Sequence, residues 1–331
     1  MGRTLNPMEI RSFRKVDYLR ISITDRCNLR CFYCQPEEIP IFQHTDILSY
    51  EEILFIVRAA AKAGFHKIRL TGGEPLARRD ITNLISSLTA VDGIEEVTLT
   101  TNGVLLEDMA SSLFTAGLRR INVSLDTLHP LKFYKITGKN YFHQVWRGLE
   151  QALALGFDPI KINMVVIRGV NDDELELFAR WAMESPFCIR FIEYMPIGPK
   201  NGWHPSKFVS IDEMRSRLMR MGTLDQMTPS ESDGPAQCFY LNSSGKIGLI
   251  GALSHCFCQT CNRLRLTPDG KLRPCLLSDQ EIDVKGRLRS NCTEGDLIRL
   301  IHQTVLTKFE NSGYLEQRPQ SSCRGMSRIG G

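Results

Sequence analysis

Six short apolar runs alternate with helical segments over the first 193 residues, and this alternation limits the possible folds more than any other feature. The runs that predict strands are 18–23, 67–70, 96–100, 120–124, 160–167 and 189–193. The segments that predict the helices between them are 51–63, 81–88, 105–115, 143–155 and 172–183. Such an order favours a parallel sheet with right-handed crossovers. Because a closed eight-stranded barrel needs about 250 residues, we expect an α/β fold with an open, partial (β/α)6 TIM-like barrel.

The pattern changes after Glu193, where several prolines and glycines predict a long connection. One helix is predicted at 211–221, and short strands are predicted at 238–242, 246–250, 264–267 and 271–273. We therefore expect two parts. Residues 1–235 form the core with the partial barrel, and residues 236–331 form a smaller C-terminal α+β region.

The cysteines need a chemical reason, because the chain has 11 of them among its 331 residues. Residues 1–14 are polar and do not predict a secretion signal, and no apolar run reaches the roughly 18 residues that span a bilayer. A cytoplasmic location, where thiols stay reduced, favours metal or cluster ligation over disulfides. The net charge of +4 permits an anionic substrate and gives no reason to expect a nucleic-acid or membrane partner.

The first cysteine group is Cys27, Cys31 and Cys34, directly after the first predicted strand. The loops that follow the strands form the functional face of a parallel barrel. Three thiolates can hold three irons of a four-iron cluster and leave the fourth iron open for a small molecule. A zinc site is the alternative, although zinc usually takes four ligands and the nearest further candidate is His44. Inert core cysteines are the third possibility.

The second cysteine group is Cys258, Cys261 and Cys275. The residues between Cys261 and Cys275 alternate polar and apolar side chains on both sides of a Pro-Asp-Gly turn, which predicts a hairpin. The hairpin returns Cys275 to the other two cysteines, so that three sulfurs converge with one ligand missing. Cys256 could supply a fourth ligand and close the site around zinc or a cluster, and this alternative stays open.

Two further features could bind a ligand. Arg263 and Arg265 stand two apart on the first hairpin strand and therefore share one face, where they could hold phosphate or simply face solvent. Residues 71–75 (TGGEP) follow the second strand, and Gly72 and Gly73 would let a ligand approach the backbone closely. An ordinary turn is the alternative for this segment.

The CxxxCxxC motif with an aromatic residue before its last cysteine resembles the radical S-adenosylmethionine superfamily, and TGGEP resembles that superfamily's GGEP segment. The ordered set of segments, from about residue 19 to residue 331, resembles the GTP 3′,8-cyclase family (molybdenum cofactor biosynthesis protein A). The matching segments are LRISITDRCNLRCFYC, IRLTGGEPL, TLTTNG, INVSLDTL, FIEYMPIG, FCQTCNRLRLTPDGKLRPCL and MSRIGG.

The resemblance implies a radical lyase that converts GTP to (8S)-3′,8-cyclo-7,8-dihydroguanosine 5′-triphosphate, the first step of molybdenum cofactor biosynthesis. It implies two [4Fe–4S] clusters with three cysteine ligands each, S-adenosylmethionine, and a homodimer. The electron donor is not identified by the sequence. No catalytic side chain is expected beyond the cofactor ligands.

The resemblance also assigns residues by their positions. The cluster ligands are Cys27, Cys31 and Cys34 for the first cluster and Cys258, Cys261 and Cys275 for the second. The S-adenosylmethionine contacts are Tyr33, Gly73, Ser124 and Met195. The GTP contacts are Arg20, Arg69, Thr100, Lys161, Arg263, Leu264 and Arg265. The tail that would reach the active site ends in Gly330 and Gly331.

Two departures from the family pattern are Gln35, where the family often has methionine, and the extra Cys256. Neither removes a ligand. Two other functions remain to be weighed: a two-cluster radical enzyme that modifies a peptide, and a zinc or iron–sulfur interaction protein. The first would not need the Arg263 and Arg265 pair or the terminal glycines, and the second predicts closed sites with four ligands.

Overall fold

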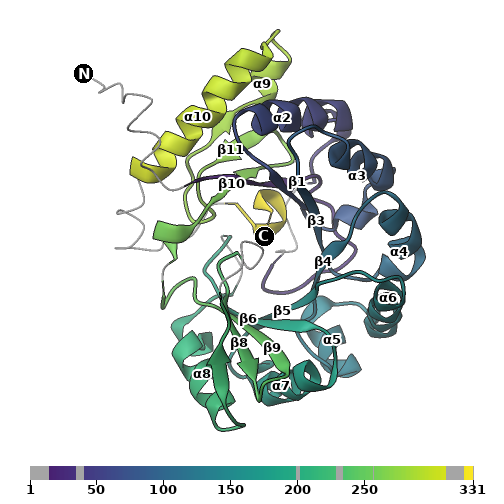
Figure 1. Cartoon of the computed structure of the whole chain (residues 1–331), viewed down its shortest axis with the longest axis vertical. Coiled ribbons are helices and arrows are strands. Elements are labelled where there is room, and N and C mark those ends of the chain that lie inside the picture. Colours follow the sequence, from purple (N-terminus) through teal and green to yellow (C-terminus); the bar gives the residue numbers. More distant parts are fainter. Residues whose placement is uncertain are drawn as a thin grey trace.

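The six predicted strands are present and pair in sequence order with all neighbours parallel. The computed structural model describes residues 15–34, 41–198, 202–228, 234–255, 257–310 and 324–330. The strands are β1 (Tyr18–Ser22), β2 (Lys67–Thr71), β3 (Glu96–Thr101), β4 (Arg120–Ser124), β5 (Ile160–Val166) and β6 (Cys188–Glu193). The sheet curves around a central space and the helices cover its outer face, which confirms the open, partial barrel (Figure 1).

Helices follow the strands as predicted, with one addition. They are α2 (Tyr50–Lys62), α3 (Ile81–Thr89), α4 (Leu106–Thr115), α5 (Pro130–Thr137), α6 (Phe142–Ala154), α7 (Leu175–Glu184) and α8 (Ile211–Met219). The added helix is α5. Proline is favoured at the first position of a helix, which Pro130 occupies, and Gly138 ends the helix with a left-handed φ of 69°. The helix predicted at 172–183 is interrupted near its start, because the buried Glu174 carboxylate accepts hydrogen bonds from Thr127 and Leu128.

The C-terminal strands extend both edges of the same sheet, which the sequence did not predict. β10 (Arg263–Leu266) lies parallel to β1, and β11 (Lys271–Arg273) and β12 (Ile282–Asp283) follow antiparallel. On the other edge β9 (Gly245–Ile250) lies parallel to β6, and β8 (Gln237–Leu241) and β7 (Leu224–Gln226) follow antiparallel. The predicted hairpin is confirmed by the pairing of β10 with β11. The division of the chain at residue 235 stays a prediction.

The last helices are α9 (Lys285–Leu288), α10 (Glu294–Glu310) and α12 (Met326–Ile329). α10 packs against α2 and β11, and α12 packs against β1. Helix α12 therefore lies near the middle of the barrel (Figure 1). In the described part of the chain, no helix has the length and apolar character needed to cross a membrane.

Side chains that alternate along each strand point in turn to the apolar core under the helices and to the interior of the barrel. Outward residues such as Ile21, Ile68 and Leu99 are fully buried under the helices. The residues between them, such as Arg20 and Arg69, point into the barrel, since successive side chains of a strand face opposite sides. The inner face is therefore polar and charged while the outer face forms the apolar core.

Candidate active site

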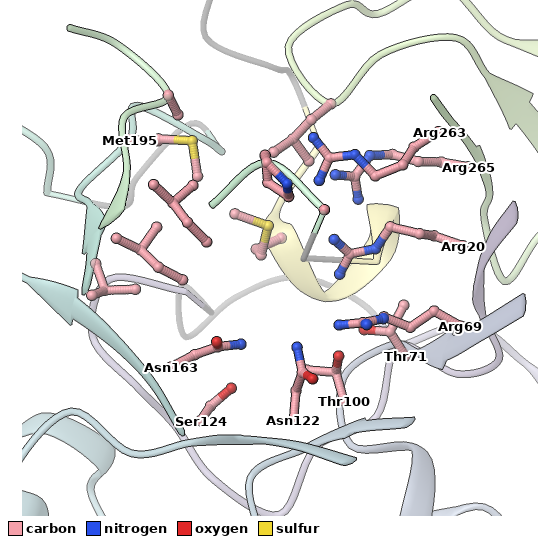
Figure 2. A pocket seen from close by; sticks show the side chains of 18 of the residues that line it. Arg20, Arg69, Thr71, Thr100, Asn122, Ser124, Asn163, Met195, Arg263 and Arg265 are labelled. Atoms are coloured by element: carbon pink, nitrogen blue, oxygen red, sulfur yellow. The ribbon is translucent and has the colours of Figure 1, made fainter. Parts of the chain in front are cut away.

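A cavity of about 330 Å³ occupies the middle of the partial barrel. Its walls are the inner faces of the strands and the loops that follow them (Figure 2). The predicted site residues that line it are Arg20, Cys27, Cys31, Tyr33, Cys34, Arg69, Gly73, Thr100, Ser124, Met195, Cys258, Cys261, Arg263, Arg265 and Cys275. Residues from both ends of the sequence thus meet in one space.

Three predicted residues do not line the cavity. Leu264 is fully buried on the opposite face of β10, because it lies between the inward Arg263 and Arg265. Lys161 shares the inward direction of Asn163 on β5 but lies two residues nearer the start of that strand. Gly330 contacts a lining residue instead, as described below. Gly331 and the extra Cys256 lie outside the described residues.

The environment of the first cysteine group suits iron ligation. Burial raises the pKa of Cys34 to about 12, and burial together with the neighbouring Cys34 and Asp126 raises that of Cys31 well above its ordinary value. Three thiolates here need positive charge, which iron supplies. No disulfide joins the cysteines that the structure describes, and none of the described side chains gather as three ligands around a single ion. A four-iron cluster binds each thiolate through a different iron, so spread sulfurs fit it.

The glycine segment packs directly on the loop that carries the first cysteines. The Gly73 N–H donates to the Thr24 carbonyl at 2.7 Å, and the Glu74 N–H donates to the Arg26 carbonyl at 2.7 Å. A Cβ atom at Gly73 would lie 2.2 Å from the Arg26 oxygen, which no side chain tolerates. The glycine is therefore required by backbone packing as well as by any ligand.

Glu74 links this segment to the next strand. Its carboxylate has no exposed surface and accepts hydrogen bonds from the Thr101 hydroxyl at 2.7 Å and the Asn102 N–H at 2.7 Å. The Asn102 amide in turn donates to Asn28 at 2.7 Å and lies 3.7 Å from the Cys27 sulfur. Asn102 was not predicted from the sequence, although it lies in the matching TLTTNG segment.

Burial raises the pKa of Glu74 from 4.5 to about 7, even with these donors. The folded chain therefore holds the proton more tightly than the unfolded chain, and this contribution to stability is complete below pH 4.5 and lost as the pH rises to about 7. Relative to Glu74→Gln, the free energy of unfolding of the parent chain should fall by up to about 3 kcal/mol over that range. Urea unfolding under anaerobic conditions measures it, and a difference that does not vary with pH would contradict the assignment.

Tyr33, between the second and third cysteines, is held by a buried carboxylate. Its hydroxyl donates to Asp126 at 2.5 Å, and the other Asp126 oxygen accepts the Val165 N–H at 2.9 Å. Burial raises the pKa of Asp126 to about 6 and, with the nearby negative charge of Asp126, raises that of Tyr33 well above its ordinary value. Asp126 was also missed from the sequence, although it follows Ser124 by two residues in a matching segment.

The second cysteine group has a different electrostatic environment. Cys258 begins the short 3-10 turn η5 (Cys258–Thr260), Cys261 directly follows it, and Cys275 follows β11. Burial alone would raise the pKa of Cys261, but the charges of Arg263 and Lys308 lower it to about 5. Cys261 is therefore a thiolate before any metal binds, which prepares it as a ligand.

Four arginines gather on one side of the cavity, opposite Met195 (Figure 2). Burial lowers the pKa of Arg20 well below its ordinary value, with Arg265 and Arg69 adding to the shift; burial and Arg263 lower that of Arg265 to about 9. Like charges this close indicate an anionic ligand such as a polyphosphate.

Two buried side-chain oxygen atoms on the cavity wall have no hydrogen-bond partner within the described part of the chain: the hydroxyl oxygen of Thr100 and the amide oxygen of Asn163. Both side chains point into the cavity from β3 and β5 (Figure 2). Buried polar atoms are normally paired, so these two are available to a polar ligand.

The C-terminal segment closes on the arginine wall. Arg265 donates a hydrogen bond to the Gly330 carbonyl, and the Ser22 hydroxyl donates to the Ser327 carbonyl at 3.4 Å. Gly330 has a φ of 71°, and a Cβ atom there would lie 2.8 Å from the Thr71 methyl group. The tail thus reaches the interior, with Met326 lining the cavity.

Comparison with known proteins identifies the chain's relatives. The Radical SAM superfamily matches residues 21–182, and Molybdenum Cofactor Synthesis C matches residues 187–314. The GTP 3′,8-cyclase of Thermodesulfovibrio yellowstonii is 46% identical over 322 residues, which cover 96% of this chain and 98% of that protein. The GTP 3′,8-cyclase of Moorella thermoacetica is 46% identical over 320 residues, with the same coverage.

Solved structures share the fold at low sequence identity. Streptococcus suis SuiB bound to S-adenosylmethionine has a TM-score of 0.60 at 16% identity, covering 93% of this chain and 70% of that one. Histidine-tagged anSMEcpe with bound AdoMet has a TM-score of 0.56 at 16% identity, covering 86% of this chain and 80% of that one. These likenesses concern the fold alone.

The partial barrel, the cysteine loop and the packed glycine segment define a radical S-adenosylmethionine enzyme, a class built on a [4Fe–4S] cluster and S-adenosylmethionine. Within that class the chain belongs to the GTP 3′,8-cyclase family, whose reaction is the first step of molybdenum cofactor biosynthesis. The enzyme is a radical lyase acting on GTP, and the peptide-modifying and interaction-protein alternatives have no comparable support.

Proposed function

We propose that this cavity holds two [4Fe–4S] clusters and converts GTP to (8S)-3′,8-cyclo-7,8-dihydroguanosine 5′-triphosphate between them. Cys27, Cys31 and Cys34 hold the first cluster, and Cys258, Cys261 and Cys275 hold the second. The observation that carries this proposal is that all six thiols line one cavity. Each group leaves one iron without a cysteine, so each cluster has a position for a small molecule.

S-adenosylmethionine binds against Tyr33, Gly73, Ser124 and Met195. When bound to the first cluster, it supplies the 5′-deoxyadenosyl radical that takes hydrogen from C3′ of GTP. The side chains and backbone of this protein orient S-adenosylmethionine. Asp126 accepts the hydrogen bond of the Tyr33 hydroxyl at 2.5 Å and so holds the tyrosine ring. The packing of Gly73 on Arg26 fixes the loop beside the first cysteines. Orientation matters because misplacement of a reacting group by about 1 Å can cost about 100-fold in rate.

GTP binds with its phosphates on the wall formed by Arg20, Arg69, Arg263 and Arg265, and with a polar contact to Thr100. The closeness of four buried guanidinium groups supports this placement, because anionic oxygens offset their repulsion. Lys161 and Leu264 remain proposed GTP contacts, although neither lines the cavity. The barrel walls exclude water from the radical steps.

The tail, ending in Gly330 and Gly331, completes the nucleotide site. The hydrogen bond from Arg265 to the Gly330 carbonyl supports this role, since the same arginine faces the phosphates. Deleting both glycines should lower GTP cyclisation by about 100-fold while both clusters assemble normally. Anaerobic turnover with GTP, together with iron and sulfide analysis, measures both, and full activity of the truncated chain would reject the role.

The test of the two-cluster site is chemical analysis combined with turnover. Anaerobically reconstituted protein should contain about eight irons and eight sulfides per chain. With GTP, S-adenosylmethionine and a strong reductant it should release the cyclised nucleotide and 5′-deoxyadenosine. About four irons per chain with full cyclisation would remove the second cluster from the proposal. We further propose that the chain is cytoplasmic and acts as a homodimer. Analytical ultracentrifugation would check the oligomeric state.

A further inference from the structure

The buried face of helix α10 ends in a lysine. Leu297, Ile301 and Thr304 face the protein interior, and Lys308 follows one turn later on the same side, with 8% of its surface exposed. An amphipathic stripe normally ends in solvent, but this one ends at the cavity wall, where Lys308 is a lining residue. The helix therefore places the Lys308 ammonium group at the wall of the cavity.

The Lys308 ammonium group contacts both chain segments that carry the second cysteine group. It donates to the Cys261 sulfur at 3.4 Å and to the Pro274 carbonyl at 2.9 Å. Cys261 directly follows the η5 turn, and Pro274 immediately precedes Cys275 after the second hairpin strand. One side chain thus joins the two segments whose spacing determines whether three thiolates can reach one cluster.

The charge of Lys308 has no carboxylate partner among the residues that the structure describes. Burying a lysine is costly unless an anion compensates it, and the Lys308 ammonium lies 3.4 Å from the Cys261 sulfur, which would carry negative charge as a ligand of the proposed cluster. A cation at this distance also favours the more negative state of whatever the thiolate binds. Arg263 also lies beside Cys261 but belongs to the arginine side of the cavity, whereas Lys308 additionally contacts the Pro274 carbonyl.

We propose that Lys308 is a positioning residue for the second cluster: it clamps the Cys258–Cys261 turn to the end of the hairpin and stabilises the reduced cluster by its charge. The inference rests on the second cluster of the proposed function. It predicts that the lysine influences this cluster and leaves the first one unchanged, because its hydrogen bonds within the described residues go to the two segments that carry the second cysteine group.

The test uses the full chain with Cys27, Cys31 and Cys34 replaced by alanine, so that only the second cluster is observed. In this background Lys308, Lys308→Met and Lys308→Arg are compared by iron content, electron paramagnetic resonance and redox titration. With Lys308→Met, the ratio of reduced to oxidised cluster at a fixed potential should fall about tenfold, which is about 59 mV for a one-electron couple. Lys308→Arg should restore most of it. Lys135→Met, on the exposed face of α5, is the matched control and should change nothing.

Each outcome decides the question. A lower potential, or loss of iron from a Lys308→Met chain that still shows a native circular dichroism spectrum, supports the role. An unchanged potential and spectrum with full iron content would overturn it. Loss of folding in both Lys308 variants would also overturn it, since the residue would then support the fold and not the cluster. If the parent chain itself binds no iron, the two-cluster proposal fails instead.

Discussion

Replacing Cys31 with alanine is expected to abolish cleavage of S-adenosylmethionine and therefore all conversion of GTP, reducing both to the background of the assay. Cys31 lies between the other two proposed ligands of its loop and lines the cavity, and no other described thiol lies in that loop besides Cys27 and Cys34. Two thiolates cannot hold the first cluster firmly, and without that cluster no radical forms. Chromatography of 5′-deoxyadenosine after anaerobic incubation with dithionite measures the effect.

The same variant separates the two cysteine groups. Because the second group is carried by other elements, Cys31→Ala should still bind about four irons per chain. Cys292→Ala is the matched control, since this cysteine lies outside the cavity, between α9 and α10, and should keep full activity. Normal formation of 5′-deoxyadenosine by Cys31→Ala would show that the loop does not hold the radical-generating cluster.

Replacing Gly73 with alanine is expected to lower S-adenosylmethionine cleavage by about 100-fold. The new methyl group would lie 2.2 Å from the Arg26 oxygen and 2.8 Å from the Asp25 oxygen, and both are backbone atoms that can move only with the loop. That loop leads directly into Cys27, so the displacement would reach the first cluster. Overpacking of this kind also costs about 1–3 kcal/mol of stability.

The control for this substitution is Gly295→Ala, in the first turn of α10. A Cβ atom there would meet nothing closer than 3.8 Å, so stability and activity should be unchanged. Equilibrium dialysis with S-adenosylmethionine and the initial rate of 5′-deoxyadenosine release measure the two variants side by side. If Gly73→Ala binds and cleaves S-adenosylmethionine like the parent chain, the packing contact has no role in positioning.

The strand pattern was enough to predict the barrel, and the family resemblance supplied the residues of the cavity wall. Once β1 and β10 are known to alternate, Arg20, Arg263 and Arg265 must face inward, and the structure places them there. The same rule sends Leu264 to the opposite face. The Lys161 side chain points to the inner face of the sheet, but it lies near the start of β5 and does not reach the cavity. Strand periodicity predicts which face a side chain points to, and it does not predict how far along the barrel axis the side chain lies.

Contacts between distant segments were not predictable. The local sequence does not predict that β10 pairs with β1 and that β9 pairs with β6. Strands pair through backbone hydrogen bonds, which any residue except proline can make, so the sequence says little about which strands are partners. Asn102 was not predicted because its hydrogen bond is made with Glu74, which lies 28 positions earlier in the chain. Lys308 had a local signal, the apolar stripe of its helix, but its contacts with Cys261 arise only from the fold.

The most direct test of the account uses GTP that carries deuterium at C3′ of the ribose. Under anaerobic conditions with S-adenosylmethionine and reductant, the account predicts that 5′-deoxyadenosine acquires one deuterium while an equal amount of the 3′,8-cyclised nucleotide forms. Mass spectrometry of both products measures this. Unlabelled 5′-deoxyadenosine formed alongside the cyclised nucleotide would contradict the claim that the radical made at the first cluster acts on C3′ of GTP within the same cavity.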